Sequence, residues 1–307
     1  MKILLAAAFA LLFAGGCSAQ TPTAPPELPA RVLLFEESFE DQNWEARGWY
    51  DSPRMPITDQ EHVPGSTHAC LWHWAKAGAV NIEGGGARLP LPPVESVTLE
   101  FFIKHSANWQ WTGRGYHPHE FHFVTNEDDP YVGPARTHLT FYVEVVDGRP
   151  RLAIQDGANI DEKHIEQDLV RLTETRAVAG CNGNSDGSGE EDCYKTGEVH
   201  ANGKYWQTER IYFGASSGPY FKGDWHQVRA RFKLNSVKEG IGMKDGELQY
   251  WFDGEKLLDE RRVVFRTGQH PDMKIDQFLM TPYYGPGVPH EQWIWIDELR
   301  IYTDQAP

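Results

Sequence analysis

The chain has 307 residues, of which 40% are hydrophobic and 12% aromatic, and this composition excludes an intrinsically disordered protein. Its 29 Lys and Arg residues against 44 Asp and Glu give a formal net charge of −15, which argues against binding to nucleic acid. The longest apolar run, residues 3–14, is shorter than the roughly 20 residues that a membrane-spanning helix requires. We therefore expect a soluble globular protein without an integral membrane domain.

The N-terminal residues predict export. The apolar run follows Lys2 and ends in small residues before Cys17, and this order is typical of a secretory signal. The ending resembles the bacterial lipoprotein signal, although Ala14 stands where Leu or Val is usual. We predict a signal peptide over residues 1–16, lipidation of Cys17, and a Pro-rich spacer over residues 17–30. Lipidation would anchor the protein in the bacterial cell envelope, at the outer membrane or in the periplasm. The alternative is ordinary cleavage near Ala19, after which the protein would be secreted.

Export makes disulfide bonds possible in the remaining chain. Cys181 and Cys193 bracket a short polar loop, so pairing them closes a smaller loop than pairing either with Cys70. We predict a Cys181–Cys193 disulfide and a buried free thiol at Cys70.

From residue 31 onward the pattern predicts one all-β domain that extends to residue 307. Short runs alternate apolar and polar residues, and Asp-Gly turn signals occur at Asp147-Gly148, Asp245-Gly246 and Asp253-Gly254. Only residues 160–177 have the apolar spacing of a helix. We expect a two-sheet antiparallel sandwich with one short helix and long loops, and we expect it to be monomeric.

Side chains alternate between the two faces of a strand, so three runs divide into a core face and a polar face. In the runs 138–146, 226–235 and 247–253 the apolar residues share one parity and the polar residues the other. The polar parity comprises His138, Tyr142, Gln227, Arg229, Arg231, Lys233, Gln249 and Trp251. If these faces belong to one sheet, its open side has a composition suited to sugars, which combine hydroxyl groups with apolar ring faces.

Two parts of the chain resemble a known family. The segment 223–254, with its strand, Asp-Gly turn and strand, resembles jelly-roll domains of the concanavalin A-like lectin/glucanase superfamily, and it is most similar to alginate-lyase-like polysaccharide lyases. The segments 34–41 and 293–302 are similar to the first and last strands of that superfamily. The resemblance implies a jelly roll that binds polysaccharide across a concave sheet and uses Tyr, His, Arg, Lys and Gln or Asn side chains there.

The residues themselves suit β-elimination on a uronate-containing polysaccharide. This reaction needs a group that neutralises the sugar carboxylate, a base for the C5 proton and an acid for the departing oxygen. Arg229 or Arg231 fits the first role, His122 or His138 the second, and Tyr142 the third. The alternative is that Arg and Lys on an outward strand face are simply solvated. The substrate-binding candidates are Trp109, Trp111, Glu120, Gln227, Lys233, Gln249 and Trp251.

The cluster 116–122 holds three His residues and Glu120, which invites a transition-metal interpretation. On a regular strand, however, Glu120 and His122 face the opposite side from His117 and His119, so the four cannot converge. We therefore place Glu120 and His122 on the open face, beside Tyr142. Hydrolysis by paired carboxylates is disfavoured because no strand carries two acids in the spacing of the retaining glucanases of this superfamily.

Calcium is the metal that an exported acidic protein favours. Residues 182–187 copy the alternating oxygen ligands of an EF-hand loop, but Cys193 stands where its bidentate Glu belongs. The resemblance implies a second candidate calcium site between the first and last strands, at Glu37 and Asp297. For both, the alternative is an ordinary loop or surface carboxylates. No other cofactor is required.

Three Trp pairs, Trp72/Trp74, Trp109/Trp111 and Trp293/Trp295, each place two rings on one strand face. Core filling is the commoner role of Trp, and we favour it for each of the three pairs. Trp109/Trp111 lies in polar, loop-like sequence and is the best candidate for sugar stacking. The sequence thus predicts an envelope protein that binds polysaccharide and cleaves it as a lyase if it is catalytic. The alternative is a non-catalytic carbohydrate-binding or adhesion module.

Overall fold

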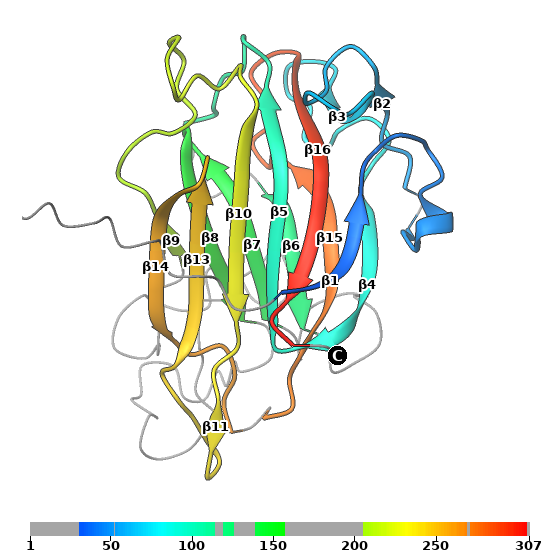
Figure 1. Cartoon of the computed structure of the whole chain (residues 1–307). Helices are drawn as coiled ribbons and strands as arrows, with labels where there is room; N and C mark the ends of the chain where they lie inside the picture. Colours follow the sequence, from blue (N-terminus) through cyan, green and yellow to red (C-terminus); the bar gives the residue numbers. More distant parts are fainter. Residues whose placement is uncertain are drawn as a thin grey trace, which may run out of the picture.

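The computed structural model describes residues 31–51, 53–113, 119–125, 139–156, 205–268 and 271–305. These residues form a sandwich of two antiparallel sheets, so the predicted all-β jelly-roll architecture is confirmed (Figure 1). Its described part contains one turn of 3₁₀ helix, η1 (Glu45–Arg47), and no helix able to cross a membrane. Cys70 is buried and free, as predicted.

Sheet A has eight strands in the order β14-β13-β10-β5-β16-β3-β2, with β1 also paired to β16. Its strands are β1 (Val32–Glu37), β2 (Ile57–Thr58), β3 (Ala69–Trp74), β5 (Ser96–His105), β10 (His226–Lys233), β13 (Gly246–Phe252), β14 (Glu255–Val263) and β16 (Gln292–Thr303). The first and last of the described strands, β1 and β16, are therefore paired within one sheet.

Sheet B has six strands in the order β4-β15-β6-β7-β8-β9 and lies behind sheet A in the view of Figure 1. Its strands are β4 (Ala87–Val94), β6 (His119–Thr125), β7 (Leu139–Val146), β8 (Arg149–Asp156), β9 (Tyr205–Gln207) and β15 (Ile275–Tyr283). A separate small hairpin consists of β11 (Val237–Lys238) and β12 (Ile241–Gly242).

The core lies between the two sheets, and aromatic rings from both fill it. Phe121 of β6 contacts Phe101 of β5 with ring centroids 4.4 Å apart, and Phe141 of β7 contacts Phe232 of β10 at 5.1 Å. All four rings are at most 3% exposed. Since these residues alternate with polar ones along their strands, the predicted parity of β7, β10 and β13 is confirmed.

Two of the three Asp-Gly signals form the predicted tight turns. Asp147-Gly148 joins β7 to β8 and Asp253-Gly254 joins β13 to β14, with positive φ at both residues of each turn, as a type I′ hairpin requires. The third prediction is wrong. Asp245 instead accepts hydrogen bonds from the backbone and hydroxyl of Ser236, and Gly246 already pairs with Val263 inside the sheet.

Candidate functional site

One rung of paired residues crosses sheet B on its outer face. Its members, in spatial order from β4 to β9, are Arg88, Leu279, His122, Tyr142, Ala153 and Tyr205. Their neighbours along the strands, such as Phe121 and Phe278, fill the core, so the rung points away from it. Tyr142 and His122 are thus adjacent, with ring centroids 4.8 Å apart, as the sequence predicted for these two strands.

A break in strand pairing adds His119 to this face. The register between β15 and β6 shifts between Met280 and Tyr283, so that His119 pairs with Tyr283. The shift breaks the regular alternation of side chains. The His119 ring consequently lies between two phenol rings, 4.8 Å from Tyr142 and 6.2 Å from Tyr283, and 5.5 Å from His122.

Glu144 holds the His119 ring through a hydrogen bond. This side chain is 1% exposed; one carboxylate oxygen is 2.8 Å from His119 Nδ1, and the other accepts hydrogen bonds from Arg151 Nε and Nη2 at 2.8 and 2.6 Å. Burial by itself would raise the pKa of Glu144, but the charge of Arg151 and the hydrogen bond from His119 outweigh it and lower the pKa. An ionised Glu144 makes Nδ1 the donor, which leaves Nε2 as the nitrogen of His119 that can accept a proton.

His122 has a different environment. The residue is half-buried, and desolvation of its imidazole together with the charge of His119 lowers its pKa to about 3. Nδ1 lies 3.3 Å from the Thr281 hydroxyl, while Nε2 is buried without a hydrogen-bond partner. A nitrogen with such a pKa is a weak base, so the geometry favours His119 over His122 for proton abstraction.

The prediction that Glu120 shares the open face with His122 is wrong. Glu120 is 1% exposed, and its charge would act on the phenols of Tyr250 and Tyr284, both buried in the core. Burial raises the pKa of Glu120 well above its usual value, and nearby Glu144 raises it further. The displaced register of β6 puts His119, rather than Glu120, beside the rung.

The polar residues of β10 and β13 do not join this site, because the three polar faces do not share one sheet. Both strands belong to sheet A, where carboxylates neutralise the arginines. Arg229 Nε is 2.6 Å from Glu100, which Arg31 also binds, and Arg231 Nη1 is 2.6 Å from Asp304. The remaining predicted residues on this face are Gln227, whose backbone N–H binds Asp253, Gln249, which donates to Asp259, and Trp251, which lies under Arg229 and Lys256.

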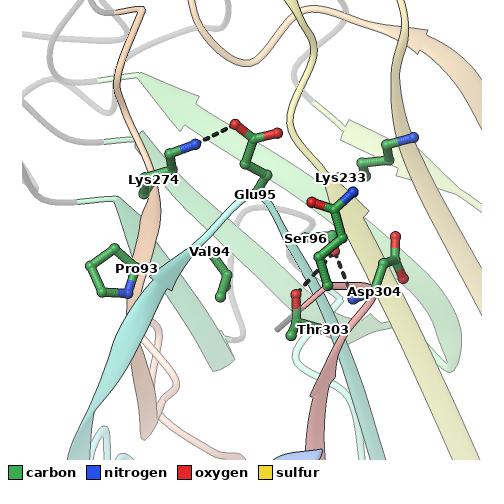
Figure 2. A pocket seen from close by; sticks show the side chains of 9 residues that line it. Pro93, Val94, Glu95, Ser96, Lys233, Lys274, Thr303 and Asp304 are labelled. Atoms are coloured by element: carbon green, nitrogen blue, oxygen red, sulfur yellow. Dashed lines mark hydrogen bonds and ion pairs between the residues drawn. The ribbon is translucent and has the colours of Figure 1, made fainter. Parts of the chain in front are cut away.

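Lys233 lines a cavity at the end of the sandwich, between the ends of strands from both sheets. The cavity has a volume of about 300 Å³, and Lys233 and Lys274 project from different parts of its wall (Figure 2). Lys274 is paired with Glu95, and Lys233 Nζ is 3.6 Å from Glu247. This cavity is separate from the rung of sheet B.

The Trp pairs divide between the core and the outer face of sheet A. Trp72 and Trp74 are fully buried, as expected. Trp109, predicted to stack on sugars, is 1% exposed and packs against Trp74 and Tyr284, because its loop folds over the end of the core. Trp111 is half-buried beside it. Trp293 and Trp295, expected in the core, are half-buried and have the opposite parity to the core residues of β16.

The proposed calcium ligands Glu37 and Asp297 are both buried. Glu37 accepts hydrogen bonds from Phe39 N, Trp49 Nε1 and Arg47 Nε, so a guanidinium already provides its counter-charge. Asp297 is bound by Val63 N and Glu298 N, and burial raises its pKa to about 6. Among the described residues, no three His, Cys, Asp or Glu side chains form a group able to hold a metal ion. These contacts do not favour calcium at Glu37, and calcium binding stays a prediction.

Several predicted residues lie outside the described ranges: His138, the disulfide pair Cys181 and Cys193, the helix over 160–177, the acidic loop 182–193, and Cys17 with the residues before the domain. Their predicted roles remain predictions.

Sequence reasoning missed Arg151 and the role of Glu144, although a signal was present. The Asp147-Gly148 turn fixes the β7–β8 register, and counting outward from it pairs Val146 with Arg149 and Glu144 with Arg151. The partnership of Glu144 with His119 had no comparable signal, because it depends on the displaced register between β6 and β15.

Comparisons with known proteins agree with this architecture. Residues 172–300 match the family model described as "Polysaccharide lyase", and residues 172–204 of that range lie outside the described residues. The endo-β-1,4-glucuronan lyase from the fungus Trichoderma reesei has a similar structure, with 13% identity, coverage of 89% of this chain and 96% of that chain, and a TM-score of 0.50. An alginate lyase from a Chlorella virus, also 13% identical, covers 80% of this chain and 90% of its own with a TM-score of 0.48. A search of curated proteins finds no match.

The resemblance to polysaccharide lyases, stated above from short sequence segments, is therefore confirmed: a polysaccharide lyase model matches residues 172–300, and the chain shares the jelly-roll fold of glucuronan lyase.

Proposed function

We propose that the protein binds a uronate-containing polysaccharide on the outer face of sheet B and cleaves it by β-elimination. The observation that carries this proposal is the arrangement of His119 and Tyr142. The two rings are 4.8 Å apart on one face, and an ionised, buried Glu144 holds Nδ1 of His119. A proton acceptor and a proton donor are thus placed together.

In the proposed reaction, His119 Nε2 takes the proton from C5 of the uronate. The electron pair of that C–H bond forms the C4–C5 double bond, and the bond between C4 and the glycosidic oxygen breaks. The Tyr142 hydroxyl gives its proton to the departing oxygen, and His119 then returns its proton to the tyrosinate. No water is consumed, and the products are a new sugar end and an unsaturated uronate.

Abstraction at C5 requires that the neighbouring carboxylate be neutralised. Arg88 suits this role better than Arg151. Its ion pair with Asp51 is solvent-accessible, with side-chain exposures of 21% and 58%, and such pairs are weak enough to exchange for a ligand. Arg151 is committed to Glu144, because both side chains of that pair are at most 8% exposed.

The comparisons support the substrate class. The similar structures are described as acting on glucuronan and alginate, both polymers of uronic acids, and the matched family model is that of polysaccharide lyases. We extend that chemistry to this chain because its own candidate site combines an imidazole, a phenol and two guanidinium groups on one sheet face.

The test is the Tyr142→Phe variant, assayed on alginate and on glucuronan by the ultraviolet absorbance of the unsaturated product. Loss of the proton donor is expected to reduce kcat by about 10²- to 10⁴-fold. The matched control is Tyr302→Phe, which removes the same hydroxyl from the outer face of sheet A and should leave kcat unchanged. Equal activity of Tyr142→Phe and wild type would exclude the proposed role. Retention of glycan by the wild type without any unsaturated product would instead favour a carbohydrate-binding module.

We also keep the proposal that the protein is exported and tethered to the cell envelope through a lipid on Cys17. It depends on the N-terminal sequence alone. Metabolic labelling with a radioactive fatty acid should mark the wild type and not Cys17→Ser, and unlabelled wild type would exclude the anchor.

A further inference from the structure

Exposed aromatic side chains are rare in the described part of this protein. Of all its Phe, Trp and Tyr residues there, only Tyr205 and Tyr283 are exposed, at 57% and 38%, and the others are buried or half-buried. Burying an aromatic ring is the usual outcome of folding, so two such rings in solvent call for an explanation.

Both exposed rings lie on the outer face of sheet B, on opposite sides of Tyr142. Tyr205 pairs with Ala153 on β8, the residue that also pairs with Tyr142. Tyr283, on β15, lies beside His119 with ring centroids 6.2 Å apart and planes inclined by 21°. Two strand spacings therefore separate each tyrosine's strand from β7, which is about 10 Å on either side.

Each ring adjoins a member of the candidate machinery. The Arg151 guanidinium lies 5.5 Å from the Tyr205 ring, and His119 is next to Tyr283. Between Tyr205 and Tyr142 stands the small side chain of Ala153, so no large residue of the rung separates them. In succession along this face lie the exposed ring of Tyr205, the buried Tyr142 at 8% exposure, the half-buried His119 and the exposed ring of Tyr283.

We propose that Tyr205 and Tyr283 stack against sugar rings on the two sides of the cleaved bond. The inference rests on the proposed function and adds to it the two side chains that hold sugar units on either side of the reacting pair. Two rings about 19 Å apart across four strand spacings are farther apart than a disaccharide can reach. Only a longer segment with sugar units on both sides of the scissile bond occupies both.

The experiment compares Tyr205→Ala, Tyr283→Ala and the double variant with wild type, using alginate and glucuronan as polymers and the trisaccharide of each as a short substrate. Loss of a stacking ring is expected to weaken polymer binding and raise the polymer KM about 3- to 10-fold per tyrosine, with kcat almost unchanged. The double variant should show the product of the two effects. The trisaccharide should be affected less, because it cannot span both rings.

Two further variants separate stacking from other roles. Tyr205→Phe and Tyr283→Phe keep the ring and should retain wild-type affinity. The matched control is Tyr302→Ala on the outer face of sheet A, a half-buried tyrosine under Arg31, which should not change polymer binding.

Binding, measured by calorimetry with the same polymers, distinguishes this inference from the proposed function. If the wild type binds polymer without cleaving it and the alanine variants lose affinity, the stacking role stands and the lyase reaction is excluded. Unchanged polymer binding in the double alanine variant overturns the stacking role, whether or not the wild type cleaves. A wild type that binds neither polymer overturns both proposals.

Discussion

The outer faces of the two sheets use the same kinds of side chain to different effect. On sheet A, Arg229 and Arg231 lie against Glu100 and Asp304, and these ion pairs satisfy charge within the face. On sheet B, the pair of Arg151 and Glu144 is almost fully buried and holds a third group, the imidazole of His119. Outward polar residues alone therefore do not mark a site. The two faces differ because the ion pairs of sheet A only neutralise each other, whereas the ion pair of sheet B also orients a group that can exchange protons.

The largest expected effect tests whether the two kinds of ion pair differ in energy. Arg151→Leu leaves Glu144, 1% exposed, without its cation and should lower the free energy of unfolding by about 3–5 kcal/mol. Arg229→Leu should cost only about 0–1 kcal/mol, because its side chain is 24% exposed and Arg31 remains on Glu100. Urea unfolding measures both. Adding Glu144→Leu to Arg151→Leu should recover much of the lost free energy of unfolding. Equal losses for Arg151→Leu and Arg229→Leu would show that the two kinds of ion pair do not differ in energy.

The second effect is the pH dependence of stability that is due to Asp297, a carboxylate on sheet A whose hydrogen-bond partners are all neutral. Asp297 is bound by two backbone N–H groups and the Ser66 hydroxyl, and burial raises its pKa from 3.8 to about 6. The folded state thus binds this proton more tightly than the unfolded state. Protonated Asp297 therefore adds up to about 3 kcal/mol to the free energy of unfolding. This stabilisation is complete below pH 4 and is lost as the pH rises to about 6.

Urea unfolding between pH 4 and pH 7 measures this dependence, and Asp297→Asn serves as the reference because it cannot titrate. The part of the pH dependence that is due to Asp297 should be missing in the variant. Identical slopes for the two proteins over this range would show that Asp297 does not titrate there.

The smallest effect examines how Glu144 acts on catalysis. Under the proposed function, Glu144→Gln should reduce kcat about 10- to 100-fold, since the amide orients His119 less well than a carboxylate. The same variant should leave the polymer KM nearly unchanged, because Glu144 contacts His119 and Arg151 rather than the substrate. Asp304→Asn removes a carboxylate from an arginine on sheet A and should leave both quantities unchanged. A Glu144→Gln variant with reduced stability but an unchanged kcat would assign Glu144 a purely structural role.

The sequence predicted the sandwich and the parity of its strands because both depend on local patterns. Apolar alternation assigned Phe141, Phe232 and Tyr250 to the core, and two Asp-Gly pairs marked tight turns correctly. It also placed Tyr142 and His122 on one face. It could not place the arginines of β10, because parity says which residues share a strand face and not which strands share a sheet.

By itself, then, the amino-acid sequence determined the all-β class, the jelly-roll resemblance and the residue types available for chemistry. Only the tertiary structure decided that β10 and β13 lie in one sheet and β6 and β7 in the other, and that His119 rather than Glu120 joins Tyr142. The physical reason is that strand order and a shifted register come from contacts between residues far apart in the chain, such as Tyr283 with His119. Such contacts leave no periodic trace in either segment alone.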